Sequence, residues 1–109
     1  MLAKLLGSIN KERVLIYLAA RDRGYSREIA RFFKGSLSPV QNALDSLEAA
    51  GVLVSRSAGS TREYEFNPRY PARSELASLI ERALSLYPAK LRDQLLLTRS
   101  RPRRRGKPL

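Results

Sequence analysis

The sequence contains neither cysteine nor histidine in its 109 residues. Disulfides and metal sites built from thiolate or imidazole are therefore excluded, and only oxygen ligands remain for a metal ion. The same absence excludes a cysteine nucleophile, a serine–histidine pair and a histidine pH switch. Ten Asp and Glu residues remain, but they lie among basic residues at spacings that suggest no acid–base pair. We therefore expect no enzymatic activity, no metal and no cofactor.

Long apolar segments are also lacking. No stretch approaches the roughly 18 apolar residues that a membrane-spanning helix needs. The N-terminal segment "MLAKLLGSINKER" has several leucines, but it lacks the long apolar stretch and the small-residue cleavage site of a secretory signal peptide. The sequence therefore predicts a cytoplasmic, nucleoid-associated protein that does not bind membranes.

Positive charge is abundant. Lys and Arg number 21 against 10 Asp and Glu, which gives a formal net charge of +11 and a sequence pI near 10.9. A pI above about 9 is typical of nucleic-acid-binding domains. Residues 98–109 are predicted to be a disordered basic tail, which fits DNA, RNA, an acidic protein or anionic lipid. Six of the eleven net charges lie there, on Arg99, Arg101, Arg103, Arg104, Arg105 and Lys107.

Hydrophobic periodicity predicts three helices in the first half of the chain. Residues 1–9 can add one or two helical turns before a first helix over about 11–23, capped by Asn10 and ended by Gly24. Tyr25 is expected as a bridge residue. Ser26 is expected to cap a short second helix, "REIARFFK", in which Ile29, Ala30 and Phe33 face inward.

The third predicted helix covers residues 38–50. Ser38 reads as its N-cap and Pro39 as its first residue, although Ser36 is a competing cap that would place Pro39 later in the first turn. Gly51 is expected to stop the helix. Its inward stripe comprises Val40, Ala43, Leu44, Leu47 and Ala50.

Two strands are expected next, because "VLVS" and "REYEF" alternate as half-buried strands do. The polar segment "RSAGST" is predicted as the loop between them. A fourth helix should run over about 72–87. After Pro88, "AKLRDQLLL" is either a fifth helix or a continuation beyond a kink.

This order gives a mainly α chain with a small β-hairpin: a three-helix core, a wing and C-terminal helices. Residues 25–71 resemble winged helix-turn-helix transcriptional regulators of the ArsR-like group. The resemblance covers roughly residues 5–87. The chain differs from the metal-sensing members of the group because it lacks their cysteines and histidines. The exit "NPRYP" and the helix after it are similar to a subset found near or fused to nucleotidyltransferase-like domains. The matching motifs are Ile29-Ala30, Ser38-Pro39-Val40, Leu44, "LEAAG" at 47–51 and Val52-Leu53-Val54.

The resemblance implies sequence-specific binding of double-stranded DNA by residues 1–71. Residues 38–50 would enter the major groove, and the wing, residues 55–62, would contact the backbone or the minor groove. The expected contacts are Arg27, Arg31, Lys34, Ser36, Ser38, Gln41, Asn42, Asp45, Arg56, Ser57, Ser60, Thr61, Arg62, Arg103, Arg104 and Arg105. Each of these side chains could equally be an ordinary solvated residue.

Residues 72–97 are expected to form a homodimer, because the apolar stripe of the fourth helix is wider than a small wing domain needs. Two-fold proteins read two half-sites about one DNA turn apart. The alternative is that their apolar stripe packs on the first helix of the same chain. Two other functions stay open: a protein-interaction module, with a partner such as a nucleotidyltransferase-like protein, and a nonspecific nucleic-acid or RNA binder. The expected dimerisation stripe is Leu76, Leu79, Ile80, Ala83, Leu84 and Tyr87.

Overall fold

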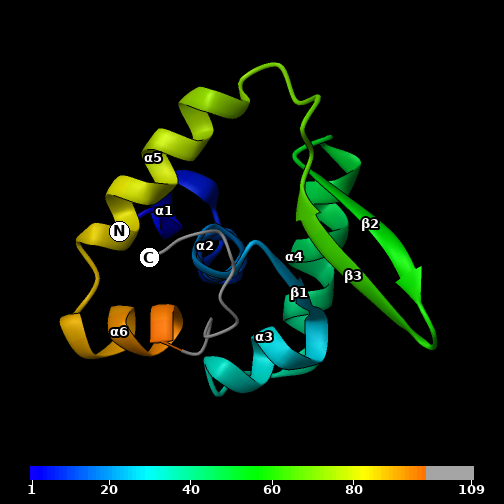
Figure 1. Cartoon of the computed structure of the whole chain (residues 1–109), viewed down its shortest axis with the longest axis horizontal. Coiled ribbons are helices and arrows are strands. Elements are labelled where there is room, and N and C mark those ends of the chain that lie inside the picture. Colours follow the sequence, from blue (N-terminus) through cyan, green and yellow to red (C-terminus); the bar gives the residue numbers. More distant parts are fainter. Residues whose placement is uncertain (98–109) are drawn as a thin grey trace.

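The computed structural model describes residues 1–97. Helix α2 lies at the centre, with α4 and the strands on one side and α5 and α6 on the other (Figure 1). This arrangement confirms the predicted mainly helical winged helix-turn-helix fold. No helix in this range is both long and apolar enough to cross a membrane. The elements are α1 (Ala3–Leu6), α2 (Ile9–Arg21), β1 (Arg23–Tyr25), α3 (Ser26–Phe32), α4 (Leu37–Ala49), β2 (Leu53–Ala58), β3 (Thr61–Phe66), α5 (Arg73–Ser85) and α6 (Ala89–Leu97).

The central helix α2 is buried along most of its length. The predicted inward residues Val14, Leu15 and Leu18 are all in the core, and so are Ile16 and Tyr17. A helix that is apolar on more than one face packs against partners on more than one side. Here α4 and α5 both pack on α2, so α2 is the central element of the core.

The ends of α2 differ from the prediction. Ser8 is its N-cap and its Oγ accepts from the Lys11 N–H at 3.1 Å, so the helix starts before Asn10. It ends at Arg21, because Asp22 has a positive φ of 72°. The predicted stop, Gly24, lies in β1 instead, where an added Cβ would sit 2.8 Å from the buried Tyr17 ring. The expected turn before this helix is α1.

The sheet has three strands, in the order β1-β3-β2, rather than the two of a simple hairpin. Tyr25 was expected to form a single bridge, but the whole of β1 pairs antiparallel with β3. Tyr25 is also the N-cap of α3, and its N–H donates to Glu28 Oε1 at 3.1 Å, so the predicted cap at Ser26 is one residue late. The added strand attaches the wing directly to the start of α3.

The hairpin turn is tighter than the predicted loop of residues 56–61. Strands β2 and β3 stay paired up to Ala58 and Thr61, so the turn consists of Gly59 and Ser60. Gly59 has a φ of 69°, a left-handed conformation that glycine adopts without steric cost. Most of the predicted loop is therefore strand.

Helix α4 begins at the competing cap. Ser36 is its N-cap, and Pro39 is the third helical residue rather than the first. The predicted stripe is buried except for Ala50, which is the exposed C-cap. Gly51 follows with a φ of 83° and ends the helix as expected. The predicted recognition segment thus begins and ends one residue earlier than 38–50.

The C-terminal segment forms two separate helices, with Pro88 between them. Helix α5 is shorter than the predicted 72–87 and leaves Tyr87 in the connection to α6. In the expected dimerisation stripe, Ile80 and Ala83 are fully buried within the chain's own core. These two residues pack within the chain, because α5 lies against α2.

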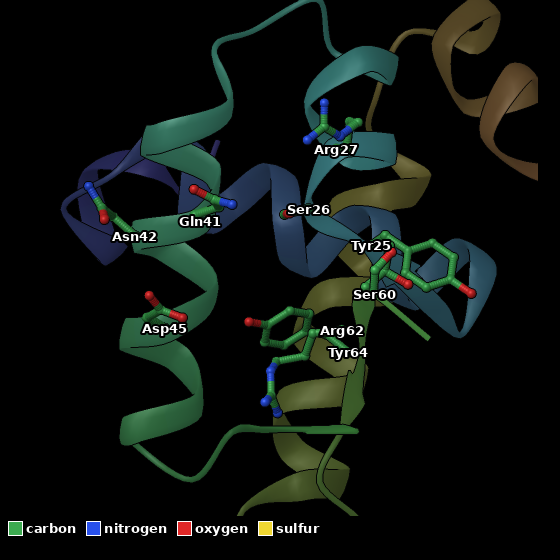
Figure 2. A pocket seen from close by; sticks show the side chains of 10 residues that line it. Tyr25, Ser26, Arg27, Gln41, Asn42, Asp45, Ser60, Arg62 and Tyr64 are labelled. Atoms are coloured by element: carbon green, nitrogen blue, oxygen red, sulfur yellow. The ribbon is translucent and has the colours of Figure 1, made fainter. Parts of the chain in front are cut away.

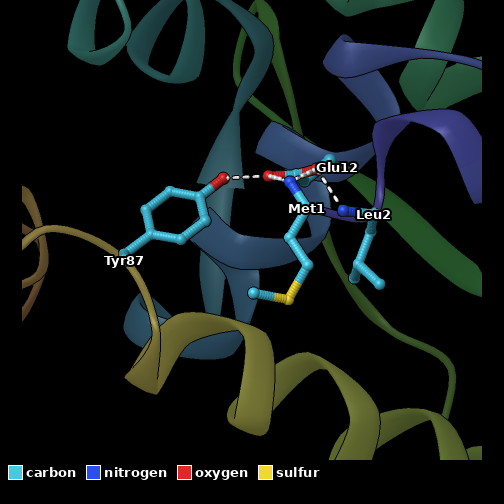
Figure 3. Close-up of polar contacts among 4 residues, drawn as sticks. All are labelled: Met1, Leu2, Glu12 and Tyr87. Carbon is cyan, nitrogen blue, oxygen red and sulfur yellow. Dashed lines mark hydrogen bonds and ion pairs between the residues drawn. The ribbon is translucent and has the colours of Figure 1, made fainter.

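A buried carboxylate joins distant parts of the chain, and the sequence pattern gave no sign of it. Glu12 on α2 is 2% exposed and accepts from the Leu2 N–H at 2.7 Å and the Tyr87 hydroxyl at 2.5 Å. The Met1 ammonium lies 3.1 Å from the same carboxylate (Figure 3). Burial alone would raise the pKa of Glu12, but these hydrogen bonds together hold it below its usual value of 4.5.

We predict that Glu12→Gln lowers the free energy of unfolding at neutral pH by about 1–3 kcal/mol, because buried donors lose a charged acceptor. The lowered pKa means that this stabilisation is present above pH 4.5 and is lost as the pH falls through the folded-state pKa. Urea unfolding at pH 7 and pH 3 should therefore show the gap between wild type and variant narrowing in acid.

Glu81→Gln is the matched control, since Glu81 is exposed on α5, and it should change little at either pH. A gap between wild type and Glu12→Gln that is unchanged or wider at pH 3 would contradict the assigned role of the carboxylate.

Candidate nucleic-acid interface

The two faces of α4 have opposite environments. Val40, Ala43, Leu44 and Leu47 are buried, whereas the side chains between them at the helical spacing point to solvent. This follows from the helical period, which separates an apolar stripe from a polar one on the same rod. The exposed polar stripe consists of Gln41, Asn42 and Asp45.

This polar stripe forms one wall of a groove of about 460 Å³. The other walls come from the β1–α3 junction and from the wing strand β3 (Figure 2). The groove brings seven of the sequence-predicted contacts together and adds three that the sequence did not suggest. The predicted residues are Arg27, Gln41, Asn42, Asp45, Ser60, Thr61 and Arg62, and the added residues are Tyr25, Ser26 and Tyr64.

Other predicted contacts lie outside the groove. Arg31 and Lys34 are exposed on α3 and in the turn after it, and Ser36 and Ser38 are exposed at the start of α4. Lys34 has a φ of 56°, which places the turn between the two helices in a left-handed conformation. Arg103, Arg104 and Arg105 lie outside the described residues.

Of the two wing arginines, Arg62 lies on a strand as predicted, whereas Arg56 was expected in the loop segment and lies on a strand instead. Arg56 lies within β2, and its Nη2 forms an exposed ion pair with Glu63 Oε1 at 3.2 Å. Arg62 lies on β3, and its Nη1 donates to Ser55 Oγ at 3.0 Å. Exposed ion pairs contribute at most about 1 kcal/mol, so a phosphate group can compete for Arg56. Ser57 is exposed next to it.

A hydrogen-bonded connection joins the wing to α4. Ser55 Oγ donates to Glu48 Oε2 at 2.6 Å, and the same hydroxyl accepts from Arg62. The first of these hydrogen bonds is partly buried and the second is exposed. They connect the wing directly to α4.

Tyr64 crosses the groove from β3 towards α4. Its side chain is 6% exposed, and its hydroxyl points to Asp45 (Figure 2). Burial is the main cause that raises the pKa of Tyr64, and the carboxylates of Asp45 and Glu48 raise it further against the opposing effect of Arg62. The phenol therefore keeps its proton at neutral pH and stays a donor. The alternation of the predicted strand puts Tyr64 and Phe66 on the same face, but it does not connect Tyr64 with Asp45.

The groove is lined mainly by polar side chains that can donate and accept hydrogen bonds. Within residues 1–97 no group of three or more Asp or Glu side chains lies close enough to hold a metal ion. The groove combines two guanidinium groups, two amides, one carboxylate and several hydroxyls. Such a set can donate to phosphates and exchange hydrogen bonds with base edges.

Comparison with known proteins gives matches among solved structures alone. No protein-family model and no curated protein matches the chain. The adhesin competence repressor AdcR from Streptococcus pyogenes is similar with a TM-score of 0.52 and 19% identity, over 85% of this chain and 81% of that one.

A second similar structure is ZitR from Lactococcus lactis, as a cysteine and histidine double mutant in apo form. It gives a TM-score of 0.53 and 23% identity, over 84% of this chain and 70% of that one. At such identities the likeness establishes the fold, and the fold is the winged helix-turn-helix of these regulators. It does not support the ArsR-like subgroup in particular.

Proposed function

We propose that this chain is a sequence-specific regulator of transcription that binds double-stranded DNA. The observation that carries the proposal is the polar stripe of α4, which is exposed beside a wing and borders a groove with two arginines. The B-DNA major groove admits one α-helix. In this arrangement α4 enters the major groove while residues 55–62 reach the adjacent backbone or minor groove. The fold is shared with AdcR, a repressor.

The amide side chains of the polar stripe would contact the base edges. Gln41 and Asn42 are exposed on successive positions of α4. Asn and Gln side chains form paired hydrogen bonds with adenine N6 and N7. Because the apolar stripe fixes the rotation of the helix about its axis, both amides keep their orientation before DNA arrives.

Phosphate contacts would come from the rim. Arg27, Arg31 and Lys34 are exposed on or just after α3, and the Ser36 side chain makes no capping bond at the start of α4. Free backbone N–H groups at a helix start favour anions. Phosphate contacts position a protein on DNA without reading its sequence.

The basic tail would add affinity without sequence preference, at about 0.9 in log–log salt slope per phosphate contact. Its point of departure is well defined. Arg21 at the end of α2 donates to the carbonyl oxygens of Leu95 and Gln94 in α6, at 3.0 and 3.2 Å. Its guanidinium also lies over the rings of Tyr17 and Phe32. Residues 98–109 therefore follow a helix that is tied to the start of the DNA-binding elements.

Residues 72–97 would form the homodimer through two apolar side chains that the chain leaves uncovered: Leu79 of the expected stripe, and Leu86, which is not part of that stripe. Leu79 is 42% exposed on α5 and Leu86 is 54% exposed just after it. Ile80 and Ala83 are instead buried in the core of the same chain, so they hold α5 in place and leave Leu79 exposed. A dimer with two-fold symmetry would place two copies of α4 on half-sites about one DNA turn apart.

Competition gel shifts against random duplex distinguish this proposal from two alternatives that the sequence leaves open. A winged-helix protein-interaction module, with a partner such as a nucleotidyltransferase-like protein, would bind no duplex with preference. A nonspecific nucleic-acid binder would bind all duplexes or RNA alike. The ArsR-like subgroup stays a hypothesis that rests on the sequence motifs alone.

We predict that Gln41→Ala with Asn42→Ala reduces the preference for selected over random duplex by at least roughly tenfold, since each paired contact with a base contributes about 1–3 kcal/mol. Truncation before Thr98 should lower the affinity for all DNA alike and flatten the salt dependence. Competition gel shifts at several salt concentrations measure both effects.

The control is Ser78→Ala with Glu81→Ala, two exposed positions on α5, which should leave both affinity and preference intact. Loss of the sequence preference on truncation, with Gln41→Ala and Asn42→Ala silent, would contradict these roles.

The dimer has its own prediction. Leu79→Asp with Leu86→Asp should shift the sedimentation of the protein from dimer to monomer, because two charges would be placed in the contact. Affinity for a duplex with two half-sites should fall more than affinity for one half-site. Dimers that persist unchanged would rule out this surface.

A further inference from the structure

The negative charge of Asp45 is unfavourable on a surface that is proposed to contact phosphates. It is the one acidic side chain among the ten residues that line the groove, and it is exposed. A carboxylate close to the DNA backbone is repelled, at a cost that salt only partly screens. Asp45 therefore has to meet something other than a phosphate.

The base edges limit what that something can be. In the major groove guanine presents the acceptors N7 and O6, and thymine presents O4 and a methyl group. Cytosine presents the N4 amine, and adenine presents the N6 amine. A carboxylate accepts and does not donate, so it gains from an exocyclic amine and loses opposite guanine O6 or thymine O4.

The structure also supplies a reason why Asp45, and not the next acid along α4, is available. Glu48 lies further along the same helix, and its Oε2 accepts from the Ser55 hydroxyl at 2.6 Å. Asp45 forms no ion pair with any residue in the described part of the chain. Arg62, the wing cation of the same groove, donates to Ser55 instead.

The Tyr64 hydroxyl faces the Asp45 carboxylate. The backbone of Tyr64 is held in the sheet, where it pairs with Gly24 on one side and Ser55 on the other, and the ring is buried. The hydroxyl is directed at Asp45 across the groove (Figure 2). One donor occupies a fraction of the hydrogen-bonding capacity of a carboxylate, so the remaining lone pairs stay open toward the groove.

We propose that Asp45 is a specificity-determining residue of the DNA site, that it accepts a hydrogen bond from an exocyclic amine, with cytosine N4 the preferred partner, and that Tyr64 positions it. The proposal rests on the proposed function and deepens it. Asp45 thus works by rejection as well as by attraction, since a guanine or thymine at that position would leave the carboxylate facing an acceptor.

The test is in-vitro selection from randomised duplexes with the full chain, with Asp45→Ala and with the control Asp93→Ala. Asp93 is exposed on α6, so the control makes the same chemical change elsewhere. The wild type and the control should select an amine-bearing base at one position, and Asp45→Ala, which has no acceptor in its side chain, should lose that preference by about tenfold while other positions keep theirs.

Two further measurements separate base reading from a structural role. Replacing the selected base with an analogue that lacks the exocyclic amine should weaken wild-type binding by about tenfold and leave Asp45→Ala binding unchanged. Tyr64→Phe, which retains the buried ring, should lower discrimination at the same position by a smaller factor and at no other position.

An Asp45→Ala variant that selects the same sites as the wild type, with higher affinity for all DNA, would overturn the proposal, because the carboxylate would then only repel phosphate. Failure of the proposed function looks different: the wild type itself would select no sequence. A lost preference at every position, with Tyr64→Phe equally affected, would also overturn it, since the residues would then only support the fold.

Discussion

The packing of α4 on α2 is the constraint on which the proposed DNA interface depends. Val40, Leu44 and Leu47 lie in the same core as the central residues of α2, and each buried side chain of this size contributes about 1.5–3 kcal/mol. Rotating α4 about its axis would expose them and bury Gln41, Asn42 and Asp45 without partners. The hydrophobic core thus determines which side of α4 faces outward, and no specific contact with DNA is needed to orient it.

The wing is placed by hydrogen bonds rather than by a core of its own. Pairing of β1 with β3 joins it to the start of α3, and the Glu48–Ser55–Arg62 connection joins it to α4. Tyr64 adds a buried ring between sheet and helix. These links turn two surfaces, one helical and one from a sheet, into two walls of the same groove.

The local parts of this fold could be predicted from the sequence, whereas its long-range contacts could not. The stripe of α4 and the glycine stop after it follow from spacing within one helix. Strand β1 has three residues and no pattern, and it forms only by pairing with a strand about 40 residues later. Glu12 is read as a surface acid until Leu2 and Tyr87 are seen to enclose it. Seven of the ten groove residues were therefore identified, while Tyr25, Ser26 and Tyr64 were missed.

The central claim is that the polar side of α4 and the wing together meet DNA. Titration of the ¹⁵N-labelled protein with a short random-sequence duplex, followed by amide chemical shifts, tests it most directly. The account predicts the largest shifts at residues 37–46 and 58–64, with α5 and the α5–α6 connection little changed. Shifts confined to α5 and α6, or to residues beyond 97, would contradict it.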